Sequence, residues 1–101
     1  MRMDEKLKLF VGEIKRLFAD ARILLFGSRA RGDFNADSDF DLIVVSKSFG
    51  ETRFINRAGV IWRNTDTALA ADLLCYTPEE FARVSKESFV IKDALKHAVA
   101  L

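Results

Sequence analysis

Two aspartates separated by a single residue, Asp39 and Asp41, stand immediately before four apolar residues at positions 42–45. In a β-strand, residues two apart project from the same face, roughly 6.6 Å apart along the chain. Carboxylates at this spacing can bind divalent cations such as Mg²⁺, including a pair of ions about 4 Å apart. The alternative is that the two aspartates only decorate a solvated strand end. The apolar run argues against it, because a charge at the edge of a buried strand costs desolvation energy and needs compensation.

A third carboxylate would complete a metal site of this kind, and the best candidate is Asp72. It lies within the sequence AADLL, where a strand would otherwise be wholly apolar. Asp66 is the weaker candidate, because Asn64 and Thr65 beside it indicate a turn. The alternative for Asp72 is a carboxylate on an edge strand that faces water.

Gly27 and Ser28 follow a short apolar run and precede a sequence that favours a helical turn. Backbone N–H groups at such a junction, together with the Ser28 hydroxyl, can bind an anion. Arg29 and Arg31 can add charge-assisted contacts to phosphate oxygens. The alternative is a turn glycine followed by a capping serine, with both arginines solvated. Taken alone, the glycine-serine pair favours that simpler interpretation.

The remaining polar residues receive structural interpretations. Asp33 and Asp37 lie in an expected loop, where solvation or turn capping accounts for them. His97 has no partner at metal-ligand spacing and is expected on a helix surface, and Cys75 is expected to be a small core residue. A P-loop is excluded, because Gly32 is followed by aspartate where that motif requires lysine.

Hydrophobic periodicity and turn residues predict the elements that position these side chains. Thr77, Pro78 and Glu80 match a capping box with proline at the first helical position, which predicts a helix start. The unbroken apolar run at 42–45 predicts a strand buried on both faces. In chain order we expect a helix over 4–19, a strand over 22–26, a short helix over 28–32, a strand over 40–46, a helix over 54–62, a strand over 68–76, a helix from 77 and a final helix over 88–98.

This order, without internal repeat or linker, predicts one domain over residues 1–101. Its class is α/β (α+β), with a small mixed sheet of three or four strands flanked by helices.

The composition is typical of a globular protein of the cytoplasm. Half of the 101 residues are hydrophobic and 31% are charged, which excludes a disordered chain. The net charge of +1 provides no broad surface for nucleic acid. The apolar runs are far shorter than the roughly 20 residues that span a bilayer, and no signal-peptide pattern is seen. A single cysteine excludes an internal disulfide and fits a reducing compartment.

Gly27-Ser28, followed after ten residues by Asp39-x-Asp41, resembles the signature of the DNA polymerase β-like nucleotidyltransferase superfamily. The stretch GSRARGDFNADSDFDLIVV is similar to the smallest branch, the minimal nucleotidyltransferases. The sequence ADLLCYTPEEF resembles the third strand and following helix of that branch, with Asp72 at the third acidic position. The resemblance extends from the first helix to about Phe81 and implies the polymerase β-like nucleotidyltransferase fold.

The resemblance also implies roles for these residues. Gly27 and Ser28 would hold the triphosphate of ATP, with Arg31 and Arg29 as further phosphate contacts. The three aspartates would be catalytic and would bind two Mg²⁺ ions that bridge the phosphates; these residues are Asp39, Asp41 and Asp72.

The expected reaction is the transfer of a nucleoside monophosphate, AMP from ATP, to a hydroxyl of a partner protein. In the resembled branch that partner is a HEPN-domain ribonuclease toxin, and this chain would be its antitoxin, in a homo- or hetero-oligomer. A nucleotidyltransferase that modifies a small molecule such as an antibiotic is one alternative, although those usually carry an extra helical domain. An antitoxin that acts by binding alone is another.

Overall fold

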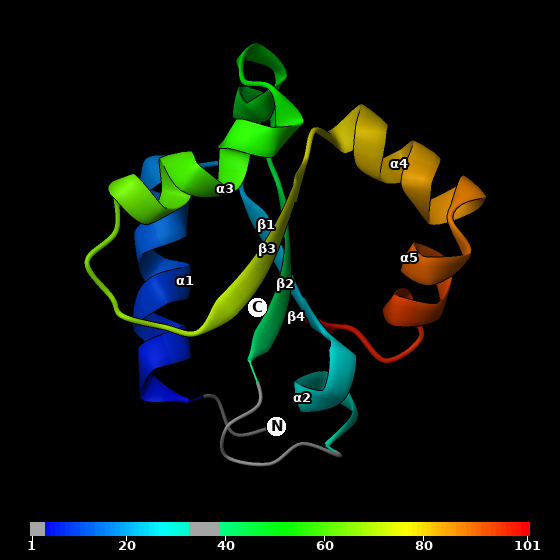
Figure 1. Cartoon of the computed structure of the whole chain (residues 1–101), viewed down its shortest axis with the longest axis horizontal. Helices are drawn as coiled ribbons and strands as arrows, with labels where there is room; N and C mark the ends of the chain where they lie inside the picture. The colour runs from blue at the N-terminus through cyan, green and yellow to red at the C-terminus, as the bar shows by residue number, and fades with distance from the viewer. Residues whose placement is uncertain (1–3, 33–38) are drawn as a thin grey trace.

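The computed structural model describes residues 4–32 and 39–101, which form a four-stranded sheet in the order β3-β2-β1-β4 with helices on both faces (Figure 1). The strands are β1 (Arg22–Phe26), β2 (Phe40–Val45), β3 (Ala71–Tyr76) and β4 (Val99–Ala100). The helices are α1 (Glu5–Leu17), α2 (Gly27–Arg31), α3 (Phe54–Arg63), α4 (Pro78–Glu87) and α5 (Phe89–Leu95), with a 3₁₀ turn η1 (Lys47–Glu51).

The sheet is mixed, as the sequence predicted. β1 pairs with β2 and with β4 in antiparallel fashion, whereas β2 and β3 are parallel. A parallel pair requires a crossover connection, and the segment between β2 and β3 contains α3, which supplies it. Strand β2 is therefore central, and β3 lies at one edge of the sheet.

The main hydrophobic core lies between the sheet and helices α1 and α3. Phe10 and Ile14 of α1 and Ile61 of α3 are fully buried against it. From the strands, this core receives alternate residues, which include Ile23, Leu25, Leu42, Val44 and Cys75. Trp62 stacks on Phe10 with ring centroids 4.9 Å apart but keeps 37% of its surface exposed, so it lies at the margin of this core.

The opposite face of the sheet is covered by α4 and α5 (Figure 1). Ile43 and Val45 of β2 are buried, as is Ile91 of α5. All four residues at 42–45 have exposed fractions of 3% or less, which confirms the prediction of a strand buried on both faces.

Helix α4 begins at the predicted capping box. The Thr77 hydroxyl accepts from the Glu80 N–H at 3.2 Å, and the Glu80 carboxylate accepts from the Thr77 N–H at 2.8 Å. Glu80 also forms a salt bridge with Arg57 of α3, whose Nη1 donates to Oε1 at 2.5 Å. This pair joins α3 to α4 around the end of β3, and Arg57 Nη1 also donates to the Cys75 carbonyl.

Several predicted elements differ from the structure. The final helix ends at Leu95 rather than 98, because Val99 and Ala100 pair with the outer edge of β1 as strand β4. The third strand begins at Ala71 rather than 68, because residues 64–70 form a loop that Glu13 of α1 holds. The 3₁₀ turn η1 was not predicted.

Among the described residues, no helix is long and apolar enough to cross a bilayer. Cys75 is buried, as expected. His97 is exposed, as expected, but it lies in the turn that follows α5 rather than on a helix.

Candidate active site

The strand pairing brings Asp41 and Asp72 side by side. Asp41 is opposite Asp72 in the parallel ladder of β2 and β3, and neighbouring strands lie about 4.8 Å apart. Asp41 is also opposite Phe26 in the antiparallel ladder of β1 and β2. Phe26, Asp41 and Asp72 thus form one row across three strands, which we call the acidic row.

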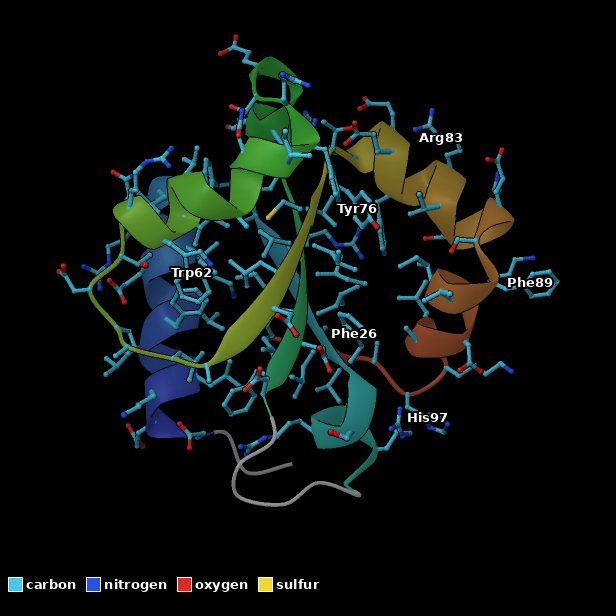
Figure 2. The ribbon with its side chains drawn as sticks, in the orientation of Figure 1. Phe26, Trp62, Tyr76, Arg83, Phe89 and His97 are labelled. Atoms are coloured by element: carbon cyan, nitrogen blue, oxygen red, sulfur yellow. The ribbon has the colours of Figure 1, made fainter. Side chains whose placement is uncertain are left out.

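This row lies on the face of the sheet that faces away from α1. Side chains alternate between the two faces of a strand, and Leu25, Phe40 and Leu42, which flank the row, belong to the core on the α1 side. Figure 2 shows the Phe26 side chain on the side of α5, whereas Trp62 lies on the side of α1. The two carboxylates therefore project into the space on the α4 and α5 side.

Asp41 is the carboxylate whose ionisation is most perturbed in this row. Burial raises its pKa above the ordinary value, and the negative charges of Asp72 and Asp39 raise it further, while Arg31 acts in the opposite direction. Asp39 and Asp72 are both exposed, and Asp39 directly precedes β2. Asp41 is thus repelled by both of the other carboxylates, which is the situation that a bound cation relieves.

The donor set fits a hard divalent cation, because carboxylate oxygens are the ligands that Mg²⁺ prefers. Within residues 4–32 and 39–101, no three acidic, histidine or cysteine side chains are gathered closely enough to form a ready-made metal cage. An ion at this site would therefore take part of its coordination from water or phosphate, as is usual for Mg²⁺.

Gly27 allows the Asp41 carboxylate to lie against the backbone at the end of β1. Its φ of 74° is in the left-handed region, and a Cβ at this position would overlap Oδ2 of Asp41 and lie 3.1 Å from its Cγ. The sequence pattern assigned Gly27 to phosphate binding or to a turn, and it missed this close approach to Asp41. The signal was the position of a glycine directly after Phe26, but its use required the strand register.

The other predicted phosphate contacts belong to α2. Ser28 is half-buried in the first turn of this helix, which ends at Gly32 with a φ of 85°. Arg29 is placed over the ring of Phe40 at 4.2 Å from its centroid, and Arg31 is near enough to Asp41 to lower its pKa. Arg31 thus lies beside Asp41, whereas Arg29 lies against a ring of the core on the α1 side.

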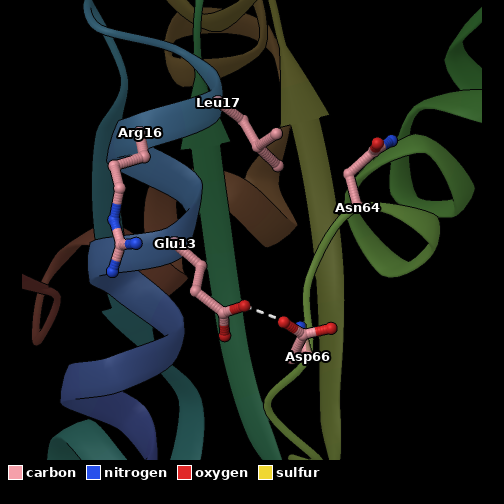
Figure 3. A pocket seen from close by; sticks show the side chains of 5 residues that line it. All are labelled: Glu13, Arg16, Leu17, Asn64 and Asp66. Carbon is pink, nitrogen blue, oxygen red and sulfur yellow. Dashed lines mark hydrogen bonds between the residues drawn. The ribbon is translucent and has the colours of Figure 1, made fainter.

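Asp66, the weaker metal candidate, lies elsewhere. It lines a polar pocket of about 210 Å³ between α1 and the loop before β3, together with Glu13, Arg16, Leu17 and Asn64 (Figure 3). Its N–H donates to Glu13 at 2.6 Å, so it contributes to anchoring the loop. Asp33 and Asp37 lie outside the described residues.

Residues 7–101 match the family model described as the nucleotidyltransferase domain. This chain belongs to the nucleotidyltransferase domain family. The match covers most of the chain and includes every residue of the acidic row. It confirms the resemblance on which the sequence analysis relied.

Two relatives of this nucleotidyltransferase domain support the assignment. It is 29% identical over 92 residues to a provisionally named protein adenylyltransferase of Methanocaldococcus jannaschii, with 89% of this chain and 90% of the relative covered. Its fold matches the crystal structure of a provisionally named nucleotidyltransferase from Sulfolobus solfataricus, with a TM-score of 0.67 and 27% identity. That match covers 95% of this chain and 76% of the other, and it confirms the predicted fold.

Proposed function

We propose that this nucleotidyltransferase moves AMP from ATP to a hydroxyl group of a partner protein. The observation that carries the proposal is the row of Asp41 and Asp72, with Gly27 against Asp41, on the sheet face opposite α1. The name of the Methanocaldococcus jannaschii relative, protein adenylyltransferase, supports a protein as the acceptor.

The phosphate end of the site is assigned to α2 and its junction with β1. The backbone at Gly27 and the Ser28 hydroxyl would donate to the triphosphate, and Arg31 and Arg29 would add charge-assisted contacts. Mg²⁺ held by Asp39, Asp41 and Asp72 would supply positive charge against the phosphates. Arg31, already beside Asp41, is placed to meet the same negative charge.

The transfer is an in-line displacement at the α-phosphorus. The acceptor oxygen forms the new O–P bond, the bond between the α-phosphorus and the pyrophosphate oxygen breaks, and pyrophosphate leaves. Asp72 is the group best placed to take the hydroxyl proton, because it is exposed and lies on the edge strand where an acceptor can approach. Asp41 is half-buried on β2, which pairs with β1 and β3, and it would hold the reacting end of the nucleotide in place.

The proposed physiological partner is a HEPN-domain ribonuclease toxin, with this chain as its antitoxin in the cytoplasm. A partner protein that brings its own hydroxyl to Asp72 fits the exposed position of this residue on the edge strand.

The test is the intact mass of the chain and of its co-encoded neighbour after incubation with Mg²⁺ and ATP. We expect a nucleotide-sized mass gain on the neighbour. Asp41→Asn should reduce the rate by roughly 100-fold or more, because it removes a charge that the transition state needs. Asp66→Asn is the matched control, since it makes the same change on the loop near α1, and it should react like the wild type.

Neutralisation of the neighbour by Asp41→Asn without any mass gain would contradict catalysis and support an antitoxin that acts by binding. Mass gain on an added small molecule, but not on the neighbour, would contradict the protein acceptor.

A further inference from the structure

The outer edge of β3 is open beside Asp72. β3 is at the end of the strand order, and within residues 4–32 and 39–101 its one pairing partner is β2. In Figure 1 the ribbon of β3 lies in front of β2, and no helix crosses in front of it. An edge strand presents unpaired backbone groups to which another extended segment can pair.

The ladder bonds fix which residues face outward. The Phe40 N–H donates to the Ala70 carbonyl at 2.9 Å, and the Ser46 N–H donates to the Tyr76 carbonyl at 3.0 Å. Because alternate residues of a parallel strand bond to the same neighbour, the even-numbered residues from 70 to 76 face β2. The backbone groups of Ala71, Leu73 and Cys75 therefore point away from the sheet.

The two ends of this edge differ. At the upper end, Arg57 Nη1 donates to the Cys75 carbonyl at 3.1 Å and occupies the edge. At the end beside the acidic row, the backbone N–H and C=O groups of Ala71 and Leu73 take no part in the ladder with β2. The open part of the edge consequently consists of the two residues that flank Asp72.

We propose that this edge binds an extended peptide segment of the acceptor protein, which adds to the sheet as an antiparallel strand and presents a serine, threonine or tyrosine hydroxyl to Asp72. The inference rests on the proposed function and specifies its acceptor class. Strand addition of this kind uses main-chain hydrogen bonds for binding and alternate side chains for selection.

The position of Asp72 in the ladder makes the arrangement suitable for transfer. Because the Asp72 backbone bonds to β2, a peptide residue opposite it forms a non-hydrogen-bonded pair, in which Cα atoms are about 4.5 Å apart and side chains are closest. That residue projects from the same face as Asp72 and Asp41. Its hydroxyl oxygen forms the bond to the α-phosphorus, its proton passes to the Asp72 carboxylate, and pyrophosphate leaves.

The test uses two proline variants of the full chain. Ala71→Pro removes an outward-facing N–H and places the ring on the open edge, a change that the first residue of an edge strand tolerates. Ala68→Pro makes the same substitution in the exposed loop three residues earlier. We expect transfer to the co-encoded neighbour to fall by roughly tenfold or more in Ala71→Pro and to stay within about twofold in Ala68→Pro. Equal transfer rates in the two variants would overturn the proposal.

A second measurement separates docking from catalysis and from misfolding. Amide hydrogen exchange of the wild-type chain is followed by NMR with and without the neighbour. The Ala71 and Leu73 amides should exchange rapidly in the chain alone and become protected in the complex. Protection without mass transfer would leave the docking intact and refute the catalytic function. A complex in which both amides remain unprotected would overturn the docking, whether or not transfer occurs.

Discussion

At the scale of single residues, the site depends on the contact between Gly27 and Asp41. A side chain at residue 27 would occupy the position of the Asp41 carboxylate, and the backbone there is in a conformation that L residues rarely adopt. Gly32 has a similar φ of 85°, but a Cβ there meets no atom of the described residues within 4 Å. The two glycines therefore share one backbone requirement and differ in their surroundings.

This difference gives a matched pair of substitutions. Gly27→Ala and Gly32→Ala should each lower the free energy of unfolding by about 1–2 kcal/mol through backbone strain. Only Gly27→Ala should also displace the carboxylate and reduce nucleotide transfer by roughly 100-fold. Chemical denaturation and the mass assay measure the two effects. Equal activity in the two variants would show that the close approach to Asp41 has no role in the reaction.

At the scale of elements, the link between α3 and α4 depends on one salt bridge. Arg57 is 5% exposed and bonds to the Thr52 and Cys75 carbonyls as well as to Glu80. Its hydrogen bond to Glu80 is the main reason that the Glu80 pKa falls from 4.5 to about 2. A carboxylate with a lowered pKa stabilises the fold above its unfolded pKa, and this contribution is lost as pH falls through the folded value.

Glu80→Gln tests this link, because glutamine keeps the capping box while removing the charge. We expect it to cost about 2 kcal/mol at pH 7. Between about pH 4.5 and pH 2 the wild type should lose stability more steeply than the variant, so the two curves converge. Denaturant titrations across this range measure the difference. A difference in the free energy of unfolding that stays constant down to pH 2 would show that the pair of Arg57 and Glu80 does not titrate as described.

The elements also show how far the sequence alone could lead. The start of α4 was predictable because Thr77, Pro78 and Glu80 act within one turn, and the buried strand β2 was predictable from its own apolar run. Strand β4 was not predictable, because Val99 and Ala100 carry no strand pattern of their own. They are extended because they pair with the outer edge of β1. The start of β3 depends on Glu13, more than fifty residues earlier in the chain. The family signature named Asp41 and Asp72, but only the register shows them adjacent.

At the scale of the whole molecule, the two faces of the sheet differ in what they contribute: one stabilises the fold and the other carries the candidate site. The α1 face holds the packed core, and the other face holds carboxylates whose mutual repulsion and partial burial oppose folding. Proteins commonly lose stability at such functional sites.

Removal of that repulsion should stabilise the protein. A raised pKa means that the ionised form of Asp41 is disfavoured in the fold, so its contribution to stability declines as pH rises through that pKa. At pH 7 without Mg²⁺, Asp41→Asn should therefore have a higher Tm than the wild type by several degrees. Mg²⁺ with ATP should raise the Tm of the wild type and leave the variant nearly unchanged, because only the former binds the ion well. A wild-type Tm that does not change when Mg²⁺ and ATP are added would contradict a metal site in this row.

Strand β2, which carries Asp41, is paired on both sides, and strand β3, which carries Asp72, is paired on one. This difference affects how the nucleotidyltransferase domain family can diversify. Asp41 is on a strand bonded on both sides, so a substitution near it disturbs two ladders, whereas Asp72 is on a strand bonded on one side. On the proposed mode of acceptor binding, changes along β3 would alter the choice of acceptor while the nucleotide end keeps its geometry. New acceptors would then be acquired by mutation of a single peripheral strand, with the donor chemistry inherited intact.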